Sequence, residues 1–368
     1  MFADDVLVGF HHRVEKQYRE IKQQYSKLIN ITGHESITPV VKFAGIQVSR
    51  NRKAGTITAH QSRYIDSVGE EYKGKFEAVD MPHGKSKEER KNFDGLDGLE
   101  GTSVTVSVYL GLVGKLVWVA STVRPDIAMS TSALCACMQA PNEKHYQFAL
   151  RTLGYLVQTK HLGITFGGRL TIPLGLDQFP PGFAESGGLH TYHDSSWGSR
   201  PRPLAGYVIM FCNGPIMWSA NFLKLVPDST KEAETAIAAR AAKDTCFARE
   251  LAKNNKRKIV GPTAMMTDNK ALYQTIDQDG SSRQTRHYER ATLLVKRAVL
   301  IRVLKMYKVD TKDMLADIFT KATDKTDFYR LRNVMMNCVS TLRDELKLAI
   351  SYLRGAPYTL ATKLVGQI

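Results

Sequence analysis

The chain has 368 residues, of which 43% are hydrophobic and 24% are charged. This is ordinary globular composition, and the length allows two or three domains with their own cores. Lysine and arginine number 51 against 36 acidic residues, and the resulting net charge of +15 favours a polyanionic partner over acidic small molecules. A soluble protein that is merely basic is the plainer alternative.

Cysteine usage and hydropathy exclude other classes. The five cysteines are odd in number and include no CxxC pair, so they indicate neither a disulfide framework nor a zinc cluster. No run approaches the roughly 18 apolar residues that a membrane span needs, and the N-terminus lacks a signal-peptide pattern. We therefore expect a soluble, intracellular protein without a membrane partner.

Short strands are predicted near the N-terminus. Residues 2–10 place Asp4 and Asp5 between two apolar runs, which predicts a β-hairpin with both acids at its tip. An isolated pair of this kind is more often a plain solvated turn. Residues 11–30 have helical spacing, and residues 42–50 and 55–68 predict two strands followed by the start of a helix.

The middle of the chain alternates polar connections with apolar segments. Residues 82–102 are charged and glycine-rich, which predicts a linker or mobile loop, and residues 167–188 are rich in proline and glycine, which predicts the main domain boundary. Cys135 and Cys137 are expected to be small core residues rather than a reactive pair. The apolar segments between the two connections predict packed helices, at 109–120, 128–138 and 142–159.

After residue 188 the pattern predicts strands and then mostly helices. Residues 189–194 alternate apolar and polar side chains. Residues 204–213 and 214–222 predict a hairpin that turns at Asn213-Gly214. Ser229 to Glu232 has the spacing of a capping box, which predicts a helix over about 230–253.

Four carboxylates recur in this half, at Asp194, Glu234, Asp268 and Asp317. Each lies at the end of a predicted strand or on the inner face of a predicted helix. The intervals of 40, 34 and 49 residues are too long for local pairing, so only a fold can bring the four together. Four carboxylates from separate elements predict a divalent-metal site, and an all-oxygen ligand set favours Mg²⁺ over zinc.

Motifs in the first 165 residues match one known family. They are Phe2–Asp5, KFAGI (42–46), QSRYI (61–65), RPDI (124–127) and YL-x-x-T-K-x-L-G (155–163). On these motifs the segment resembles the reverse transcriptase of copia-type long-terminal-repeat retrotransposons. The resemblance assigns Asp4 and Asp5 to the palm hairpin and implies a truncated palm and a helical thumb or connection. Because the family's further metal-binding aspartate lies upstream of that hairpin, we expect no polymerase activity from this chain alone.

Motifs after residue 188 match the same elements. They are YHDSSW (192–197), AGY (205–207), MWS (217–219), STKEAE (229–234), TDNKA (267–271), SRQTRH (282–287) and LADIFTK (315–321). On these motifs this half resembles the ribonuclease H domain of copia-type elements. The resemblance implies an α+β or α/β fold with a five-stranded mixed sheet flanked by helices. It also implies that the catalytic metal ligands are Asp194, Glu234, Asp268 and Asp317.

The mechanism that this resemblance implies is two-metal hydrolysis of the RNA strand of an RNA–DNA hybrid. Two Mg²⁺ ions, for which Mn²⁺ can substitute, would activate the attacking water and stabilise the leaving 3′ oxygen. The hybrid would be recognised through its 2′-hydroxyls and groove shape. Arg283, Arg286 and His287 are candidate substrate contacts, and a purely structural role for His287 is equally open.

The chain is therefore interpreted as a fragment of a copia-type Pol polyprotein, active in the cytoplasm within a virus-like particle or in the nucleus. An intact Pol protein could supply the missing palm and fingers. The competing interpretation is a decayed or co-opted nucleic-acid binder without activity. The expected domains are a distal palm (1–81), a linker (82–102), a helical thumb or connection (103–166), a linker (167–188), a ribonuclease H-like domain (189–337) and a helical tail (338–368).

Overall fold

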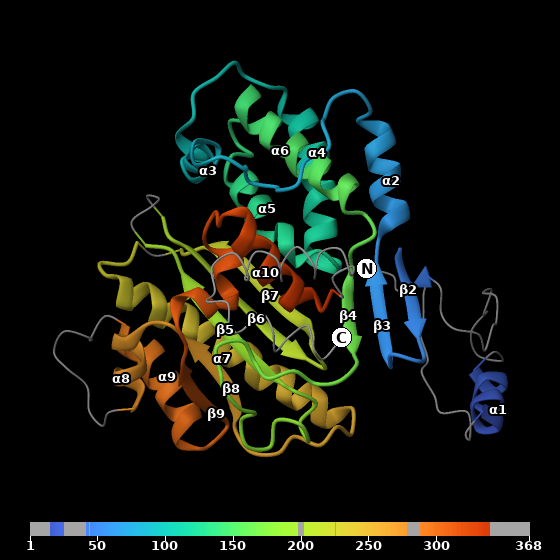
Figure 1. Cartoon of the computed structure of the whole chain (residues 1–368), viewed down its shortest axis with the longest axis vertical. Helices are drawn as coiled ribbons and strands as arrows, with labels where there is room; N and C mark the ends of the chain where they lie inside the picture. Colours follow the sequence, from blue (N-terminus) through green and yellow to red (C-terminus); the bar gives the residue numbers. More distant parts are fainter. Residues whose placement is uncertain are drawn as a thin grey trace, which may run out of the picture.

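The computed structural model describes residues 15–25, 42–43, 45–197, 202–224, 226–277 and 288–338, and Figure 1 shows their arrangement. Three groups of predicted features lie outside these ranges: Asp4 and Asp5 of the palm hairpin, the candidate substrate contacts Arg283, Arg286 and His287, and the tail after residue 338. None of the described helices is long and apolar enough to cross a membrane.

A four-stranded antiparallel sheet lies on one side of the molecule (Figure 1). Its middle strands pair as a hairpin between residues 46 and 60, and its last strand lies about a hundred residues later, where Thr56 pairs with Gly167. The elements are α1 (Glu15–Tyr25), β1 (Lys42–Phe43), β2 (Ile46–Asn51), β3 (Thr56–His60), α2 (Ser62–Glu71) and β4 (Ile164–Gly167). The second strand and the helix start are confirmed, whereas residues 42–50, predicted as one strand, contain two that pair with each other, β1 and β2.

Residues 82–102 are not the free linker that their composition predicted. They contain α3 (Lys87–Asp94), which begins with a capping box: the Ser86 hydroxyl accepts from the Glu89 amide, and the Glu89 side chain accepts from the Ser86 amide. Phe93 on this helix is fully buried. A helix of eight residues with one buried side chain has no apolar periodicity to detect, so its capping residues were the only usable signal.

The helices predicted between the two connections are confirmed. Their apolar faces form one buried core, in which Cys137 is buried and Cys135 packs against it, as expected for small core residues. Asn142 caps the last helix by accepting from the His145 amide. The elements are η2 (Leu96–Gly98), α4 (Val106–Thr122), η3 (Pro125–Ile127), α5 (Ala128–Ala136) and α6 (Glu143–Gln158).

The second sheet has five strands in the order β7-β6-β5-β8-β9 and confirms the predicted mixed sheet. β5 lies at its centre, antiparallel to β6 and parallel to β8, and β8 is parallel to β9. Turns, bends and irregular backbone, without a helix or strand, connect β4 to β5 across the predicted boundary. The strands are β5 (His190–Ser195), β6 (Leu204–Phe211), β7 (Gly214–Phe222), β8 (Thr263–Thr267) and β9 (Leu304–Lys308).

The β6–β7 turn lies one residue earlier than predicted. Phe211 pairs with Gly214, so the loop consists of Cys212 and Asn213, with φ angles of 50° and 65°. A two-residue hairpin loop of this kind requires positive φ at both positions. Asn213 tolerates that conformation, but as the second loop residue rather than the first.

Helices cover both faces of this sheet (Figure 1). Alternate residues of β6 point to opposite sides, with Val208 in the core shared with the first half and Ile209 in a separate core under α7 and α9. Both faces are therefore buried, which explains why every residue of β5 is buried. The covering elements are α7 (Thr230–Asn254), α8 (Lys270–Asp277), α9 (Glu289–Leu300), η5 (Thr311–Asp313), η6 (Leu315–Phe319) and α10 (Lys325–Met336).

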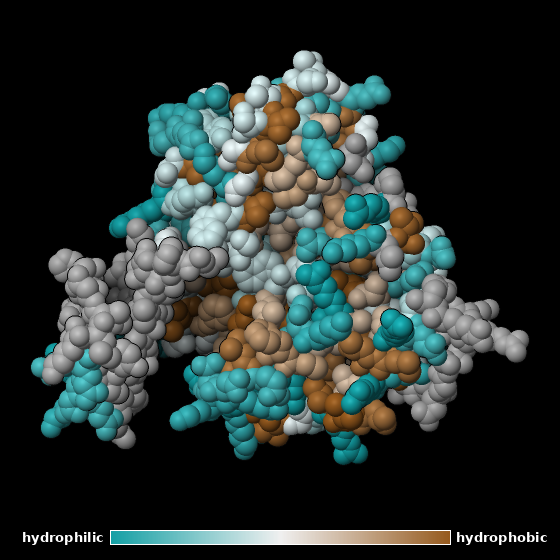
Figure 2. Space-filling view, turned by 180° about the vertical axis from the view of Figure 1, so that it is seen from behind, coloured by the Kyte–Doolittle hydropathy of each residue, from teal (hydrophilic) through white to brown (hydrophobic). Residues whose placement is uncertain are grey.

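The outer surface of the molecule is mixed in character. Viewed from behind, apolar side chains alternate with hydrophilic ones over the lower part of the molecule (Figure 2). Phe247 and Leu251 on α7, and Leu293 and Leu300 on α9, are exposed apolar residues on two helices that pack against each other.

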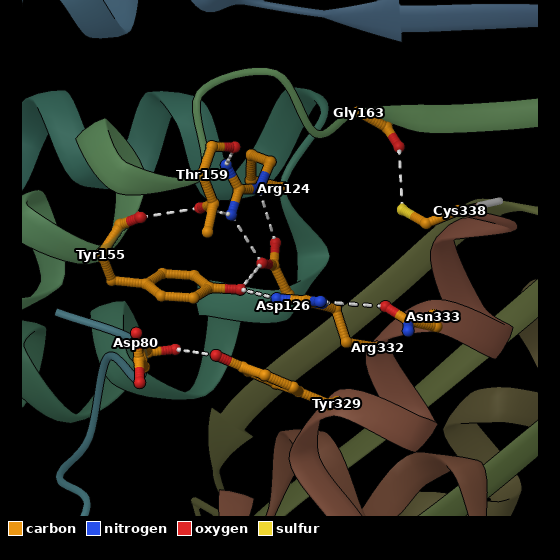
Figure 3. Close-up of polar contacts among 10 residues, drawn as sticks. All are labelled: Asp80, Arg124, Asp126, Tyr155, Thr159, Gly163, Tyr329, Arg332, Asn333 and Cys338. Atoms are coloured by element: carbon orange, nitrogen blue, oxygen red, sulfur yellow. Dashed lines mark hydrogen bonds and ion pairs between the residues drawn. The ribbon is translucent and has the colours of Figure 1, made fainter. Parts of the chain in front are cut away.

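A buried ion-pair network joins the two halves (Figure 3). The Arg124 guanidinium donates to both carboxylate oxygens of Asp126, at 2.9 and 2.7 Å, and to Thr159. The Tyr155 hydroxyl donates to Asp126 at 2.6 Å and accepts from Arg332 of α10 at 3.3 Å. The helix that closes the second half is thus anchored to the helices of the first.

Candidate metal centre

Two of the predicted carboxylates lie at one edge of the second sheet. Asp194 is on β5, and Asp268 directly follows β8. Because these two strands are parallel neighbours, their carboxyl ends meet at the same edge, which is where open sheets containing parallel strands generally bind ligands. Asp194 is buried and Asp268 is half-buried.

The third carboxylate reaches this edge from α7. Ser229 caps that helix, and its hydroxyl accepts from the Glu232 amide, which is one of the two hydrogen bonds of the predicted capping box. The Glu232 side chain accepts from the Asp228 amide. Glu234, two residues further along α7, is buried and accepts from the amide and hydroxyl of Ser195, at 3.0 and 2.9 Å.

The structure brings Asp194, Glu234 and Asp268 together, with one carboxylate oxygen of each lying within 4.8 Å of the others. The second oxygen of Glu234, Oε2, is buried and makes no hydrogen bond to any described residue. Its ion-pairing neighbour is His193, whose Nδ1 lies 3.7 Å away. A buried carboxylate oxygen without a donor is costly, and a cation would remove that cost.

The fourth carboxylate approaches from the opposite face of the sheet. η6 carries Asp317 across β6, where the close contact requires a glycine. A Cβ added at Gly206 would lie 2.4 Å from the Phe319 Cβ and 2.9 Å from the Ser219 carbonyl oxygen. Gly206 pairs with Asp194 on the neighbouring strand, so η6 passes directly beside the cluster.

Asp317 is paired with a lysine. Lys321 Nζ lies 2.7 Å from Asp317 Oδ1 and 3.4 Å from Asp194 Oδ1. The Thr320 hydroxyl donates to the other oxygen of Asp194. Asp194 therefore belongs both to the three-carboxylate group and to this lysine pair.

The cluster is electrostatically unfavourable as it stands. Burial is the main cause that raises the pKa of Asp194 well above its usual value, and the neighbouring Glu234 raises it further, while Lys321 opposes them. Burial also raises the pKa of Asp317 to about 6, against the opposing effect of Lys321. The carboxylates hold Lys321 firmly in its charged form, because their attraction outweighs its burial and raises its pKa.

The side chains fit a hard divalent cation. Asp194, Glu234 and Asp268 provide only carboxylate oxygens, and the unpartnered Glu234 Oε2 is one ligand atom left free for coordination. Mg²⁺ and Mn²⁺ prefer such ligands, whereas zinc sites favour sulfur and nitrogen. The geometry can therefore hold a cation that polarises a phosphate oxygen or a water molecule.

Sequence reasoning missed two members of this site, Thr320 and Lys321. Both stand in the LADIFTK motif, and the spacing of four residues from Asp317 to Lys321 is that of an ion pair along one helical face. That spacing was a usable signal. Lys321 and Asp194 are 127 residues apart in the sequence, and no local pattern indicated their contact.

Curated proteins similar to this chain come from retrotransposons. The retrovirus-related Pol polyprotein from transposon RE1 of Arabidopsis thaliana is 29% identical over 233 residues, which are 62% of this chain and 15% of that protein. The Pol polyprotein from transposon TNT 1-94 of Nicotiana tabacum is 24% identical over 337 residues, 89% of this chain and 23% of that protein. This chain resembles retrotransposon Pol polyproteins. The resemblance stated from the motifs is confirmed.

The extent of this Pol resemblance differs between relatives. A Ty5-1 transposon protein of Saccharomyces cerevisiae is 27% identical over 241 residues, 64% of this chain and 69% of that protein. The chain spans less than a quarter of the RE1 and TNT 1-94 polyproteins. No protein-family model matches it.

Solved structures similar to the chain are ribonucleases H. LC11-RNase H1, determined in complex with an RNA/DNA hybrid, has a TM-score of 0.28 at 15% identity and covers 36% of this chain and 93% of its own. RNase H1 from Halobacterium salinarum NRC-1 has a TM-score of 0.27 at 14% identity, with the same coverage. The strand order described above stands independently of these scores.

Proposed function

We propose that the second half of the chain is a metal-dependent ribonuclease H that hydrolyses the RNA strand of RNA–DNA hybrids. The observation that carries the proposal is the convergence of Asp194, Glu234 and Asp268 within 4.8 Å at the carboxyl edge of β5 and β8, with a buried oxygen of Glu234 lacking a hydrogen bond. The resemblance to retrotransposon Pol polyproteins supports the choice of substrate.

Each residue has a proposed task at this site. Asp194, Glu234 and Asp268 would bind Mg²⁺ or Mn²⁺, and Asp317 would complete a second ion position beside Asp194. Two ions would supply Lewis-acid chemistry that activates a water and stabilises the leaving 3′ oxygen. Ser195 orients Glu234 through two hydrogen bonds, and Thr320 orients Asp194. These contacts would hold the ligands in position before substrate arrives.

The first half is proposed, on its resemblance alone, to be the distal palm and connection of a reverse transcriptase. We propose that the first half supports the nuclease, because α10 of the second half is anchored to the first half through the hydrogen bond from Arg332 to Tyr155. Activity within a virus-like particle or in the nucleus is part of the same proposal.

The test is cleavage of an RNA–DNA hybrid with labelled RNA by the full chain in Mg²⁺. Asp194→Asn should lower the rate by about 10³-fold or more, since it removes a ligand shared by both ion positions. Asp310→Asn is the matched control, because that carboxylate is 78% exposed and pairs only loosely with Lys312 at 4.0 Å. Equal cleavage by wild type and Asp194→Asn, or cleavage that persists in EDTA, would refute the proposal. RNA and DNA homoduplexes under the same conditions define the substrate.

A further inference from the structure

Among the described residues, a lysine of the chain itself lies against two of the four carboxylates. Lys321 follows η6, and its ammonium group bridges Asp317 at 2.7 Å and Asp194 at 3.4 Å. Of the ion pairs described for the four carboxylates, two involve Lys321 and one involves His193. The cluster thus has two overlapping parts that share Asp194: the group of Asp194, Glu234 and Asp268, and the pair of Asp194 and Asp317 that Lys321 bridges.

The two parts differ in what a divalent ion would have to displace. In the group of Asp194, Glu234 and Asp268, the Oε2 atom of Glu234 makes no hydrogen bond to any described residue, so an ion entering there breaks no such bond at that atom. Between Asp194 and Asp317, the ammonium of Lys321 already occupies the space between the oxygens. A second cation at that position would meet a like charge at short range, which is strongly unfavourable.

The Lys321 side chain has the exposure and flexibility needed to move out of this position. Its side chain is 38% exposed, while those of Asp194 and Asp317 are 3% and 12% exposed. A lysine holds its charge on a flexible stem as a point charge, so it can swing into solvent without dismantling a bidentate contact as an arginine would have to.

We propose that Lys321 is a displaceable counter-ion at the second ion position, so that two divalent ions bind this site unequally and in a set order. The first ion binds Asp194, Glu234 and Asp268. The second binds between Asp194 and Asp317 only when the Lys321 ammonium moves out. This inference rests on the proposed function, because it takes the carboxylate cluster to be a metal site.

The experiment is a Mn²⁺ titration of the full chain by calorimetry and by electron paramagnetic resonance, without substrate. Wild type should show two steps, with the second at least about tenfold weaker than the first. Lys321→Met should strengthen the second step by about tenfold or more and the first step by a smaller factor, because the ammonium pairs with both carboxylates of the second position but with only one of the first. Lys321→Arg should keep the second step weak.

Lys325→Met is the matched control. Lys325 is 42% exposed and pairs with Asp80 at 2.5 Å, away from the carboxylate cluster, so its loss changes net charge equally. Its two binding steps should match those of wild type. If Lys321→Met strengthens both steps equally, or leaves the ratio between them unchanged, the inference is wrong. Thermal melting of each variant verifies that it is folded.

Two outcomes separate this inference from the proposed function. If the metal steps respond to Lys321 as expected but no hybrid is cleaved, the counter-ion role stands and the nuclease assignment fails. If cleavage requires Asp194 but the two steps are equally strong in wild type, the nuclease stands and the counter-ion role fails. Binding that survives Asp194→Asn unchanged would place the ions elsewhere and overturn both.

Discussion

Two buried clusters of charge in the described part of the chain are organised in opposite ways. In the buried ion-pair network between the two halves, which we call the joint, the side chains of Asp126 and Arg124 are completely buried. Both carboxylate oxygens of Asp126 receive hydrogen bonds (Figure 3). At the sheet edge, Lys321 pairs with Asp194 and Asp317 only, and Glu234 Oε2 receives no hydrogen bond from any described residue. The first cluster is complete within the protein, and the second is not.

The pKa values show the same contrast. Burial alone would raise the pKa of Asp126, but the charge of Arg124 and the hydrogen bonds from Arg124 and Tyr155 outweigh burial and lower it. Burial and neighbouring carboxylates leave the pKa values of Asp194 and Asp317 raised. A buried charge cluster that its own surroundings do not neutralise is a mark of a functional site rather than of a structural one.

The largest expected effect comes from breaking the complete cluster. Asp126→Asn should lower the free energy of unfolding by about 3–5 kcal/mol, because Arg124 would keep its charge in a fully buried site without a counter-charge. Urea denaturation measures this. Asp66→Asn is the control: its pair with Lys160 is about half exposed, so the loss should stay below about 1 kcal/mol. Similar losses in the two variants would show that the Arg124 pair is not energetically special.

Another contact between the halves involves a histidine that must stay neutral. His83 shares a hydrogen bond at 3.0 Å with the Thr323 carbonyl, and burial lowers its pKa from 6.5 to about 4. Between those values the unfolded chain binds a proton that the folded protein excludes. The free energy of unfolding should therefore fall as pH drops from 6.5 to about 4, by on the order of 2–3 kcal/mol.

The measurement is the difference in unfolding free energy between wild type and His83→Gln across that pH range. Other titrating groups contribute to both proteins and cancel. Because the variant lacks the histidine, its stability should fall less steeply with acid. Parallel curves would mean that His83 is readily protonated in the folded protein.

A smaller loss of stability is expected at Gly206, where η6 packs against the backbone of β6 beside the carboxylate cluster. Gly206→Ala should cost about 1–3 kcal/mol, because its Cβ would overlap Phe319 of η6. It should also reduce hybrid cleavage, since η6 carries Asp317. Gly114→Ala is the control: no atom lies within 4 Å of a Cβ added there, on α4, and alanine should be neutral or stabilising by up to about 1 kcal/mol. A fully active Gly206→Ala would show that η6 need not lie this close.

The smallest effect has the opposite sign. In metal-free buffer at pH 8, Asp194→Asn should raise the free energy of unfolding by about 1 kcal/mol, because it removes a buried charge that its neighbours repel. Mg²⁺ should stabilise wild type more than this variant, which has lost a ligand. Thermal melting with and without Mg²⁺ measures both. A destabilised variant would mean that the cluster is neutralised within the protein, as the joint is.

Local patterns were sufficient for most elements. Alternation predicted β5, the cap at Ser229 predicted the start of α7, and the oxygen-only ligand types predicted the kind of cation. Local patterns failed at α3, where one buried phenylalanine replaced a periodic face, and at the β6–β7 turn, where Asn213 takes the second loop position instead of the first.

Sequence by itself determined which residues of this protein can carry negative charge and where most of its helices and strands lie, because caps and periodicity act over a few residues. Only the tertiary structure decided how charges combine. Strand order brings Asp268 beside Asp194, α10 carries Arg332 to Tyr155, and the passage of η6 over Gly206 carries Lys321 to Asp194. These pairings depend on which face of a sheet each segment covers, and the spacing of residues along a segment does not predict that face.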